Sequence, residues 1–146
     1  MLATTFGLGL LPLAPGTFGT LGGVALFWAL QPVPDALRWV AYVVLVAVGS
    51  WSAARMGKAL GSNDHDSIVI DETLGMALLL EITSGGWAGT ASAFVLFRIF
   101  DVLKPWPIYL ADRGEHGGFF VILDDLLAAA WAAVVLYVVM RSGLVS

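Results

Sequence analysis

Apolar runs, separated by short polar or Pro/Gly-containing segments, occupy most of the chain. They predict five helices, over about residues 18–30, 36–54, 68–83, 87–103 and 119–140. The second run is close to the ~20 residues that a helix needs to cross a bilayer. Residues 1–14 are also apolar, but glycine and proline interrupt them, so we expect an interfacial or re-entrant segment. The predicted fold is therefore an all-α, polytopic membrane bundle of about five helices with this N-terminal segment, in one domain over residues 1–146.

The composition supports a membrane protein. Hydrophobic residues make up 59% of the chain, charged residues make up 12%, and the mean hydropathy is +0.88. A soluble protein of this size has too small an interior for so much apolar surface, so a tightly oligomeric soluble bundle is the weaker alternative. The formal charge of −4 provides no basic stripe for nucleic acid, and without cysteine no thiolate metal site can form.

An acidic stretch at residues 63–72 is the most prominent polar feature. It holds four of the 11 acidic residues and one of the two histidines. Carboxylates are costly to place near lipid, so a cluster of this density indicates a bound cation or a reaction. Acids at a helix start also suit the helix dipole, but that explanation accounts for one of them rather than for four.

Successive helices that cross a membrane alternate in direction. The start of the third helix, the end of the fourth and the start of the fifth should then lie on one side. The carboxylates at these three ends are Asp71, Glu72, Asp101, Asp124 and Asp125. The loops on the same side add the acids Asp64, Asp66 and Asp112 and the two histidines, His65 and His116. We therefore expect these groups to gather at one membrane surface.

The basic residues indicate which surface this is. The loops after the second and fourth helices hold Arg55, Lys58, Lys104 and Arg113. The opposite side has Arg38 and Arg141. Because cytoplasmic loops carry an excess of Lys and Arg, the acidic groups are expected to face the cytoplasm.

The acids and bases together favour phosphoryl chemistry. Acid clusters with little histidine and no cysteine suit a hard cation, most simply Mg²⁺. Arg98 and Lys104 suit an anionic oxygen group, and His65 or His116 can move a proton near neutral pH. A small membrane transporter or ion-binding protein is the alternative, because intramembrane acids also mark ion paths. That alternative predicts charges near the middle of the bilayer and paired, broken helices.

Four groups of motifs occur in order along nearly the whole chain. They are Gly7-x-Gly9 through Pro15-Gly16-Thr17-x-Gly19; Asp64-His65-x-Ser67-Ile68-Val69-x-Asp71-Glu72 with Gly75-Met76; Phe97-Arg98-Ile99-x-Asp101 with Lys104-Pro105-Trp106-Pro107-Ile108; and His116-Gly117-Gly118 leading to Asp124-Asp125. On these motifs the chain resembles the phosphatidylglycerophosphatase A family of bacterial membrane lipid phosphatases. The resemblance implies an Mg²⁺-dependent phosphomonoesterase that converts phosphatidylglycerophosphate, an anionic phospholipid, to phosphatidylglycerol and phosphate in the bacterial cytoplasmic (inner) membrane. Position 66 is Asp where the family is expected to have a small residue, so Asp66 is left out of the site.

Roles for individual residues follow as hypotheses. The expected metal ligands are Asp64, Asp71, Glu72, Asp101, Asp124 and Asp125. The expected catalytic residues are Asp71, Glu72, Asp101, Asp125 and His116, with His116 as the first choice of general acid because two glycines follow it. The expected substrate contacts are Thr17, His65, Arg98 and Lys104, with Thr17 capping the first helix beside amides that suit an anion. Spacing alone leaves open the number of metal ions, the attacking group (water or a carboxylate) and the oligomeric state.

Overall fold

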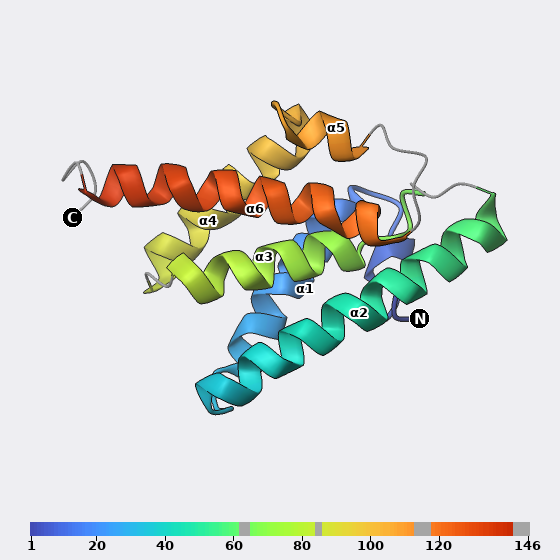
Figure 1. Ribbon diagram of the computed structural model, residues 1–146, viewed down its shortest axis with the longest axis horizontal. Helices are drawn as coiled ribbons and strands as arrows, with labels where there is room; N and C mark the ends of the chain where they lie inside the picture. The colour runs from blue at the N-terminus through green and yellow to red at the C-terminus, as the bar shows by residue number, and fades with distance from the viewer. Residues whose placement is uncertain (62–64, 84–85, 113–117, 142–146) are drawn as a thin grey trace.

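The computed structural model describes residues 1–61, 65–83, 86–112 and 118–141, and all the regular structure in these ranges is helical. The elements are η1 (Leu8–Leu10), α1 (Pro15–Leu30), α2 (Asp35–Leu60), α3 (Ile70–Thr83), α4 (Gly86–Leu103), α5 (Ile108–Asp112) and α6 (Gly118–Arg141). The five long helices are those that the apolar runs predict, so the all-α helical bundle is confirmed. Figure 1 shows them packed around α3.

Helix α3 forms the centre of the bundle. Nine of its 14 residues are buried, compared with three of the 18 residues of α4. It contacts α1, α2, α4 and α6. The first turn of α3 carries Asp71 and Glu72, so two acidic residues lie on the most buried helix of the bundle.

Glycines let α1 and α3 pack closely. A Cβ on Gly19 would lie 2.7 Å from the Val69 Cβ, and one on Gly23 would lie 2.5 Å from the Thr73 carbonyl oxygen. Small residues of this kind let two helix backbones approach each other in lipid. This contact holds the first turns of α1 and α3 side by side.

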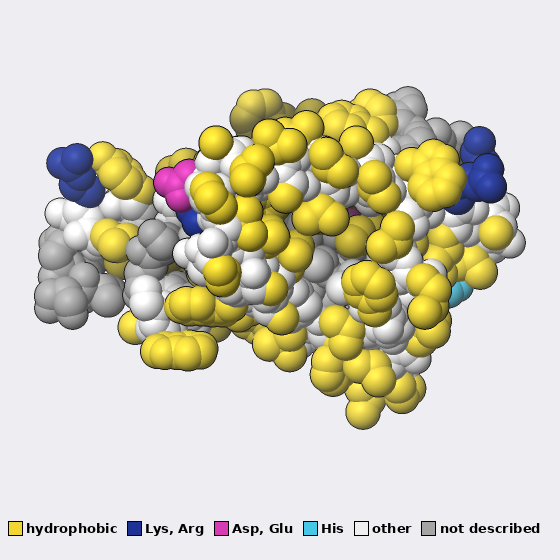
Figure 2. Space-filling view, turned by 90° about the horizontal axis from the view of Figure 1, so that it is seen from below, with side chains coloured by type: hydrophobic (Ala, Val, Ile, Leu, Met, Phe, Trp, Pro, Cys, Tyr) yellow, Lys and Arg dark blue, Asp and Glu magenta, His cyan; other side chains and the backbone are white. Residues whose placement is uncertain are grey.

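Three helices are long and apolar enough to cross a membrane by length and composition: α2, α4 and residues 119–141 of α6. The described surface seen in Figure 2 is mostly hydrophobic, with Lys and Arg side chains chiefly towards its two ends. Helices α1 and α3, with 16 and 14 residues, span roughly 24 and 21 Å, which is less than the ~30 Å apolar core of a bilayer. Helices α2, α4 and α6 are therefore the candidate spans by length, while α3 lies inside the bundle.

Two helix boundaries and one element differ from the sequence prediction. Helix α2 continues to Leu60 rather than ending near residue 54, so Arg55 and Lys58, predicted in the loop that follows it, lie inside the helix. Helix α1 begins at Pro15 with Ala14 at the N-cap, so the prediction that Thr17 caps this helix is wrong. Proline suits a first helical position because its fixed φ is already helical and its missing N–H would have no partner there. The short helix α5 was not predicted; the prolines around Trp106 end α4, and Ile108, which is fully buried, fixes the next turn against the core.

Residues 1–14 form turns and the short helix η1 beside the start of α3. The Val69 and Ile70 N–H groups both donate to the Ala3 carbonyl, at 2.9 and 3.2 Å. Phe6 and Leu13 remain largely exposed. An apolar outer side with a backbone bonded within the protein fits the expected interfacial or re-entrant segment.

A polar cluster joins the turn after α1 to the far end of α3. Arg38 donates to Glu81 at 2.9 Å and to the Val33 carbonyl at 3.0 Å, and the Tyr42 hydroxyl donates to Glu81 at 3.3 Å. Glu81 therefore lies at the end of α3 opposite Asp71 and Glu72, as the helical rise predicts, and it is used in structure.

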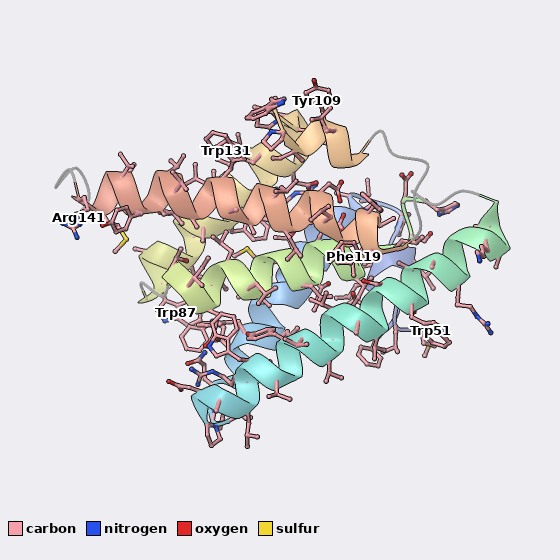
Figure 3. The ribbon with its side chains drawn as sticks, in the orientation of Figure 1. Trp51, Trp87, Tyr109, Phe119, Trp131 and Arg141 are labelled. Carbon is pink, nitrogen blue, oxygen red and sulfur yellow. The ribbon has the colours of Figure 1, made fainter. Side chains whose placement is uncertain are left out.

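Aromatic side chains project outward from several elements. Trp51 and Tyr109 point away from the bundle in Figure 3, whereas the Trp131 ring on α6 stacks on Phe100 of α4. The Arg55 guanidinium lies 5.4 Å from the centre of the Trp51 ring. Amphipathic rings and basic residues of this kind favour headgroup depth in a membrane.

Candidate active site at one end of the bundle

A polar pocket of about 300 Å³ opens where α1, α3 and α6 begin and α4 ends. Its lining includes eight of the residues proposed from sequence: His65, Asp71, Glu72, Arg98, Asp101, Lys104, Asp124 and Asp125. The expected convergence of three acidic helix ends is therefore confirmed as geometry. The functional roles of these residues stay predictions.

Three carboxylates form the centre of this pocket. Asp71, Glu72 and Asp125 each place a carboxylate oxygen within 4.8 Å of the other two. The Asp71 and Asp125 side chains are almost completely buried, with relative exposures of 8% and 3%. Asp71 and Glu72 come from the first turn of α3, and Asp125 comes from the second turn of α6, so helix packing brings them together.

The carboxylates are crowded electrostatically. Burial raises the pKa of Asp71 well above its ordinary range, and the nearby charges of Glu72 and Asp125 raise it further. Burial also raises the pKa of Glu72, against the opposing effects of its hydrogen bond with Asp71 and of the Arg98 charge. Such a group is unfavourable in its ionised form unless a cation compensates it.

One oxygen of this cluster lacks a protein partner. Glu72 Oε2 is buried and has no hydrogen-bond partner among the described residues. Buried polar atoms are normally satisfied, so an orphaned carboxylate oxygen beside two further carboxylates is suited to a ligand. The donor set is all oxygen, which is the chemistry that Mg²⁺ and Ca²⁺ prefer. Asp71, Glu72 and Asp125 therefore fit a hard divalent cation.

The absence of a side chain at Gly16 leaves space for the Glu72 carboxylate. A Cβ at this position would lie 2.5 Å from Glu72 Oε1 and 3.1 Å from Arg98 Nη1. The start of α1 thus contacts both the acidic centre and a basic residue of the pocket. Sequence reasoning assigned no role to Gly16, although its position directly after Pro15 at a helix start was a visible signal.

Two further acids of the pocket, Asp101 and Asp124, are paired with its basic residues. Arg98 forms an ion pair with Asp101, and Lys104 Nζ lies 3.0 Å from Asp124 Oδ2. All four side chains are at least partly buried. The structure thus divides the predicted ligand set into a cluster of three carboxylates and two acids that hold cationic side chains.

His65 also lines the pocket and is half-buried. Its Nδ1 accepts a hydrogen bond from the Ser67 N–H at 3.2 Å. The other ring nitrogen, Nε2, is therefore the one that can exchange a proton with a ligand. Asp66 lines the pocket as an exposed residue. Thr17 is not among the lining residues, whereas Ala14, Pro15 and Gly16 before it are. Asp64 and His116 lie outside the described residues.

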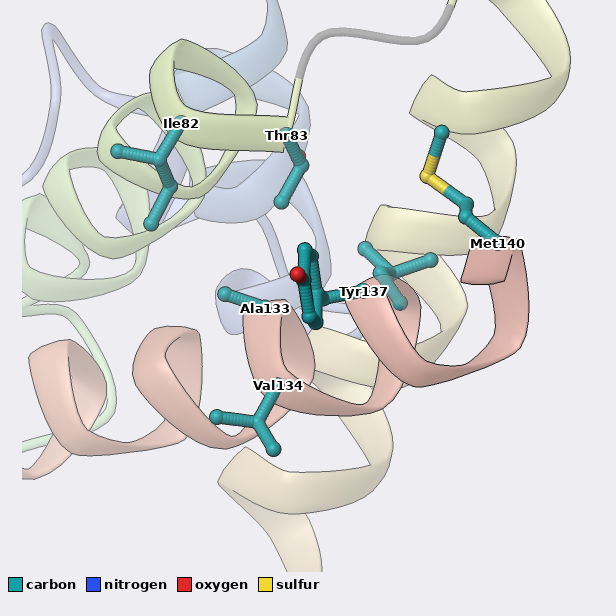
Figure 4. A pocket seen from close by; sticks show the side chains of 7 residues that line it. Ile82, Thr83, Ala133, Val134, Tyr137 and Met140 are labelled. Atoms are coloured by element: carbon teal, nitrogen blue, oxygen red, sulfur yellow. The ribbon is translucent and has the colours of Figure 1, made fainter. Parts of the chain in front are cut away.

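A second pocket, of about 460 Å³, lies at the other end of the bundle between the C-terminal parts of α3 and α6 (Figure 4). Its lining is Ile82, Thr83, Ala133, Val134, Leu136, Tyr137 and Met140. It offers no carboxylate or cationic group among these residues. The polar pocket is therefore the candidate active site.

Comparison with known proteins gives this pocket its context. The sequence model of the family Phosphatidylglycerophosphatase A matches residues 1–140. The chain belongs to this family. It is accordingly an enzyme, a membrane-associated lipid phosphatase, and this membership answers the transporter alternative.

Named relatives cover most of the chain. Phosphatidylglycerophosphatase A of Escherichia coli (strain K12) is 37% identical over 138 residues, which is 94% of this chain and 80% of the relative. Phosphatidylglycerophosphatase A of Haemophilus influenzae is 37% identical over 141 residues, covering 95% and 86% of the two chains. A Bacteroides thetaiotaomicron protein, provisionally named a phosphatidylinositol-3-phosphatase, is 34% identical over 148 residues, covering 94% and 91%. No solved structure matches the chain.

Proposed function

We propose that this phosphatase removes the terminal phosphate of phosphatidylglycerophosphate, yielding phosphatidylglycerol and inorganic phosphate, with Mg²⁺ as cofactor. The observation that carries the proposal is the cluster of Asp71, Glu72 and Asp125 beside two basic side chains in one pocket. Two relatives that span most of the chain bear the name phosphatidylglycerophosphatase A, which supports this substrate.

Asp71, Glu72 and Asp125 would hold the metal. A divalent cation bound there would supply Lewis-acid polarisation of the phosphoryl group and activation of water. The three carboxylates would coordinate that cation. Its positive charge would offset the electrostatic repulsion between them and the free-energy cost of burying them together. Glu72 Oε2, which has no hydrogen-bond partner in the described part of the chain, supports this assignment.

Arg98 and Lys104 would bind the phosphate oxygens. Charge-assisted hydrogen bonds from such groups favour a dianionic phosphate, and more so as negative charge builds up on the leaving oxygen. Asp101 and Asp124, which pair with these two side chains, would position them. His65, through Nε2, would donate the proton to the leaving alkoxide; His116 stays the alternative proton donor from the sequence.

The pocket is proposed to face the cytoplasm of the bacterial inner membrane. Arg55 and Lys58 lie near the end of α2 that leads towards α3 and the polar pocket (Figure 1). At the opposite end of the bundle, Arg141 lies at the C-terminus of α6 (Figure 3), and Arg38 forms an ion pair with Glu81. This distribution supports the cytoplasmic assignment through the positive-inside rule.

The test is phosphate release by the purified protein in detergent. Phosphatidylglycerophosphate, phosphatidic acid and phosphatidylinositol 3-phosphate are compared, each with Mg²⁺, with EDTA, and with EDTA followed by excess Mg²⁺. We expect release from the first lipid to stop with EDTA and to return with Mg²⁺. A rate that is insensitive to EDTA contradicts the cofactor, and a faster rate on another lipid monophosphate contradicts the substrate.

A further inference from the structure

A shallow groove of about 470 Å³ runs along the outward side of α4, next to the polar pocket. It is lined by Phe94, Val95, Arg98, Ile99, Val102 and Leu103. Five of these six residues are apolar. Val95, Ile99 and Val102 are exposed and recur at helical spacing, so they form a continuous apolar stripe.

The groove and the polar pocket share two residues, Arg98 and Val102. The Arg98 guanidinium belongs to the polar side, because it pairs with Asp101 and lies against Gly16. Its methylene stem is then the part that faces the groove, as is usual for long basic side chains at an apolar boundary. Arg98 thus belongs to both the polar pocket and the apolar groove.

The direction of the groove matches that of a lipid in a bilayer. Asp101 and Lys104 mark the polar pocket at the C-terminal end of α4, whereas Phe94 lies seven residues before Asp101, about 10 Å away along the axis. Helix α4 is one of the three candidate membrane spans. The groove therefore runs from the level of the polar pocket towards the bilayer interior.

We propose that this groove binds an acyl chain of the phospholipid whose phosphate occupies the polar pocket, so that the substrate enters sideways from the bilayer along α4. The inference rests on the proposed function, since it extends the same site from the headgroup to the chain. An acyl chain is the occupant that fits, because it is the apolar part of a ligand that begins at an anionic group beside Arg98. The apolar pocket between α3 and α6 lacks such a polar start.

The test measures kcat/KM on dioleoyl and dihexanoyl forms of the same lipid phosphate. In the double variant Val95→Ser, Ile99→Ser, the ratio of long-chain to short-chain kcat/KM should fall about tenfold, because several buried methyl and methylene contacts are lost. Val95→Trp, which fills the groove with an apolar ring, should lower the same ratio. The matched control is Val40→Ser, Val44→Ser on α2, where both residues are exposed and apolar with the same spacing, and its ratio should equal that of the wild type.

Each other outcome has a distinct meaning. An unchanged ratio, or an equal loss on both lipids, overturns the acyl-chain groove while leaving the phosphatase activity in place. A wild-type protein that hydrolyses neither lipid overturns the proposed function instead. A fall in oligomeric mass of the Val95→Ser, Ile99→Ser variant with an unchanged ratio assigns the groove to a second copy of the chain, and this also overturns the proposal.

Discussion

Gly16→Ala is the sharpest probe of the polar pocket, because it adds one methyl group where the start of α1 meets the acidic centre. The added Cβ would lie 2.5 Å from Glu72 Oε1 and 3.1 Å from Arg98 Nη1. Ordinary van der Waals contact begins near 3.4 Å, so the carboxylate oxygen must retreat by about 0.9 Å. The change therefore displaces a proposed metal ligand without altering its chemistry.

The size of the effect follows from this displacement. A misplacement of roughly 1 Å in a catalytic group can cost about 100-fold in rate. Global stability should not fall in parallel, because replacing glycine by alanine inside a helix is favourable by about 1 kcal/mol. We therefore expect kcat to fall by one to two orders of magnitude, with a weaker apparent affinity for Mg²⁺ and an unchanged or slightly raised melting temperature.

The assay is phosphate release as a function of Mg²⁺ concentration, with helical content and thermal unfolding measured on the same samples. Gly89→Ala is the matched control, because Gly89 also lies in a helix and a Cβ there would meet nothing within 4 Å. It should retain wild-type kcat. Activity of Gly16→Ala within twofold of the wild type would refute the placement of Glu72 in the catalytic centre.

Three further outcomes are expected. Glu72→Gln and Asp125→Asn should each abolish Mg²⁺-dependent phosphate release while the protein stays folded, and Mg²⁺ should raise the melting temperature of the wild type but not of these variants; most activity remaining in both would contradict the ligand assignment. Glu81→Ala should destabilise the fold by about 3 kcal/mol, because Arg38 loses a buried partner, with kcat preserved at a permissive temperature; a loss of kcat without a loss of stability would contradict a purely structural cluster. Because the pKa values of Asp71 and Glu72 are raised, protons compete with the metal, so apparent Mg²⁺ affinity should rise with pH through the range in which these groups ionise; a pH-independent affinity would argue against these ligands.

Much of the fold was predictable because it depends on local properties of the chain. Apolar runs and their interruptions located all five long helices. At 1.5 Å per residue, Glu81 lies roughly 14 Å along α3 from Glu72, and it bonds there to Arg38 near the start of α2. The antiparallel course of neighbouring helices predicted that the acidic ends of α3, α4 and α6 would meet, and all three line one pocket.

The errors have equally physical causes. Helix α2 runs past its predicted end because residues 55–60 contain good helix formers, and it ends only at Gly61, which adopts the left-handed conformation. The assumed cap at Thr17 failed because Pro15 already supplies a helical φ at the first position. The helix α5 was missed because five residues carry too little periodicity to be recognised, while the burial of Ile108 depends on the whole core.

The sequence by itself determined that this chain is a helical membrane protein with acids and bases at one end of the bundle, because hydrophobicity, charge and helical spacing are written residue by residue. Only the tertiary structure decided how those groups divide. It places Asp71, Glu72 and Asp125 together and pairs Asp101 and Asp124 with basic side chains. That division depends on contacts of a few ångströms between side chains of different helices. The close approach of α1 to α3 at Gly16, Gly19 and Gly23 positions the Glu72 side of the carboxylate cluster, and this approach exists only in the packed bundle.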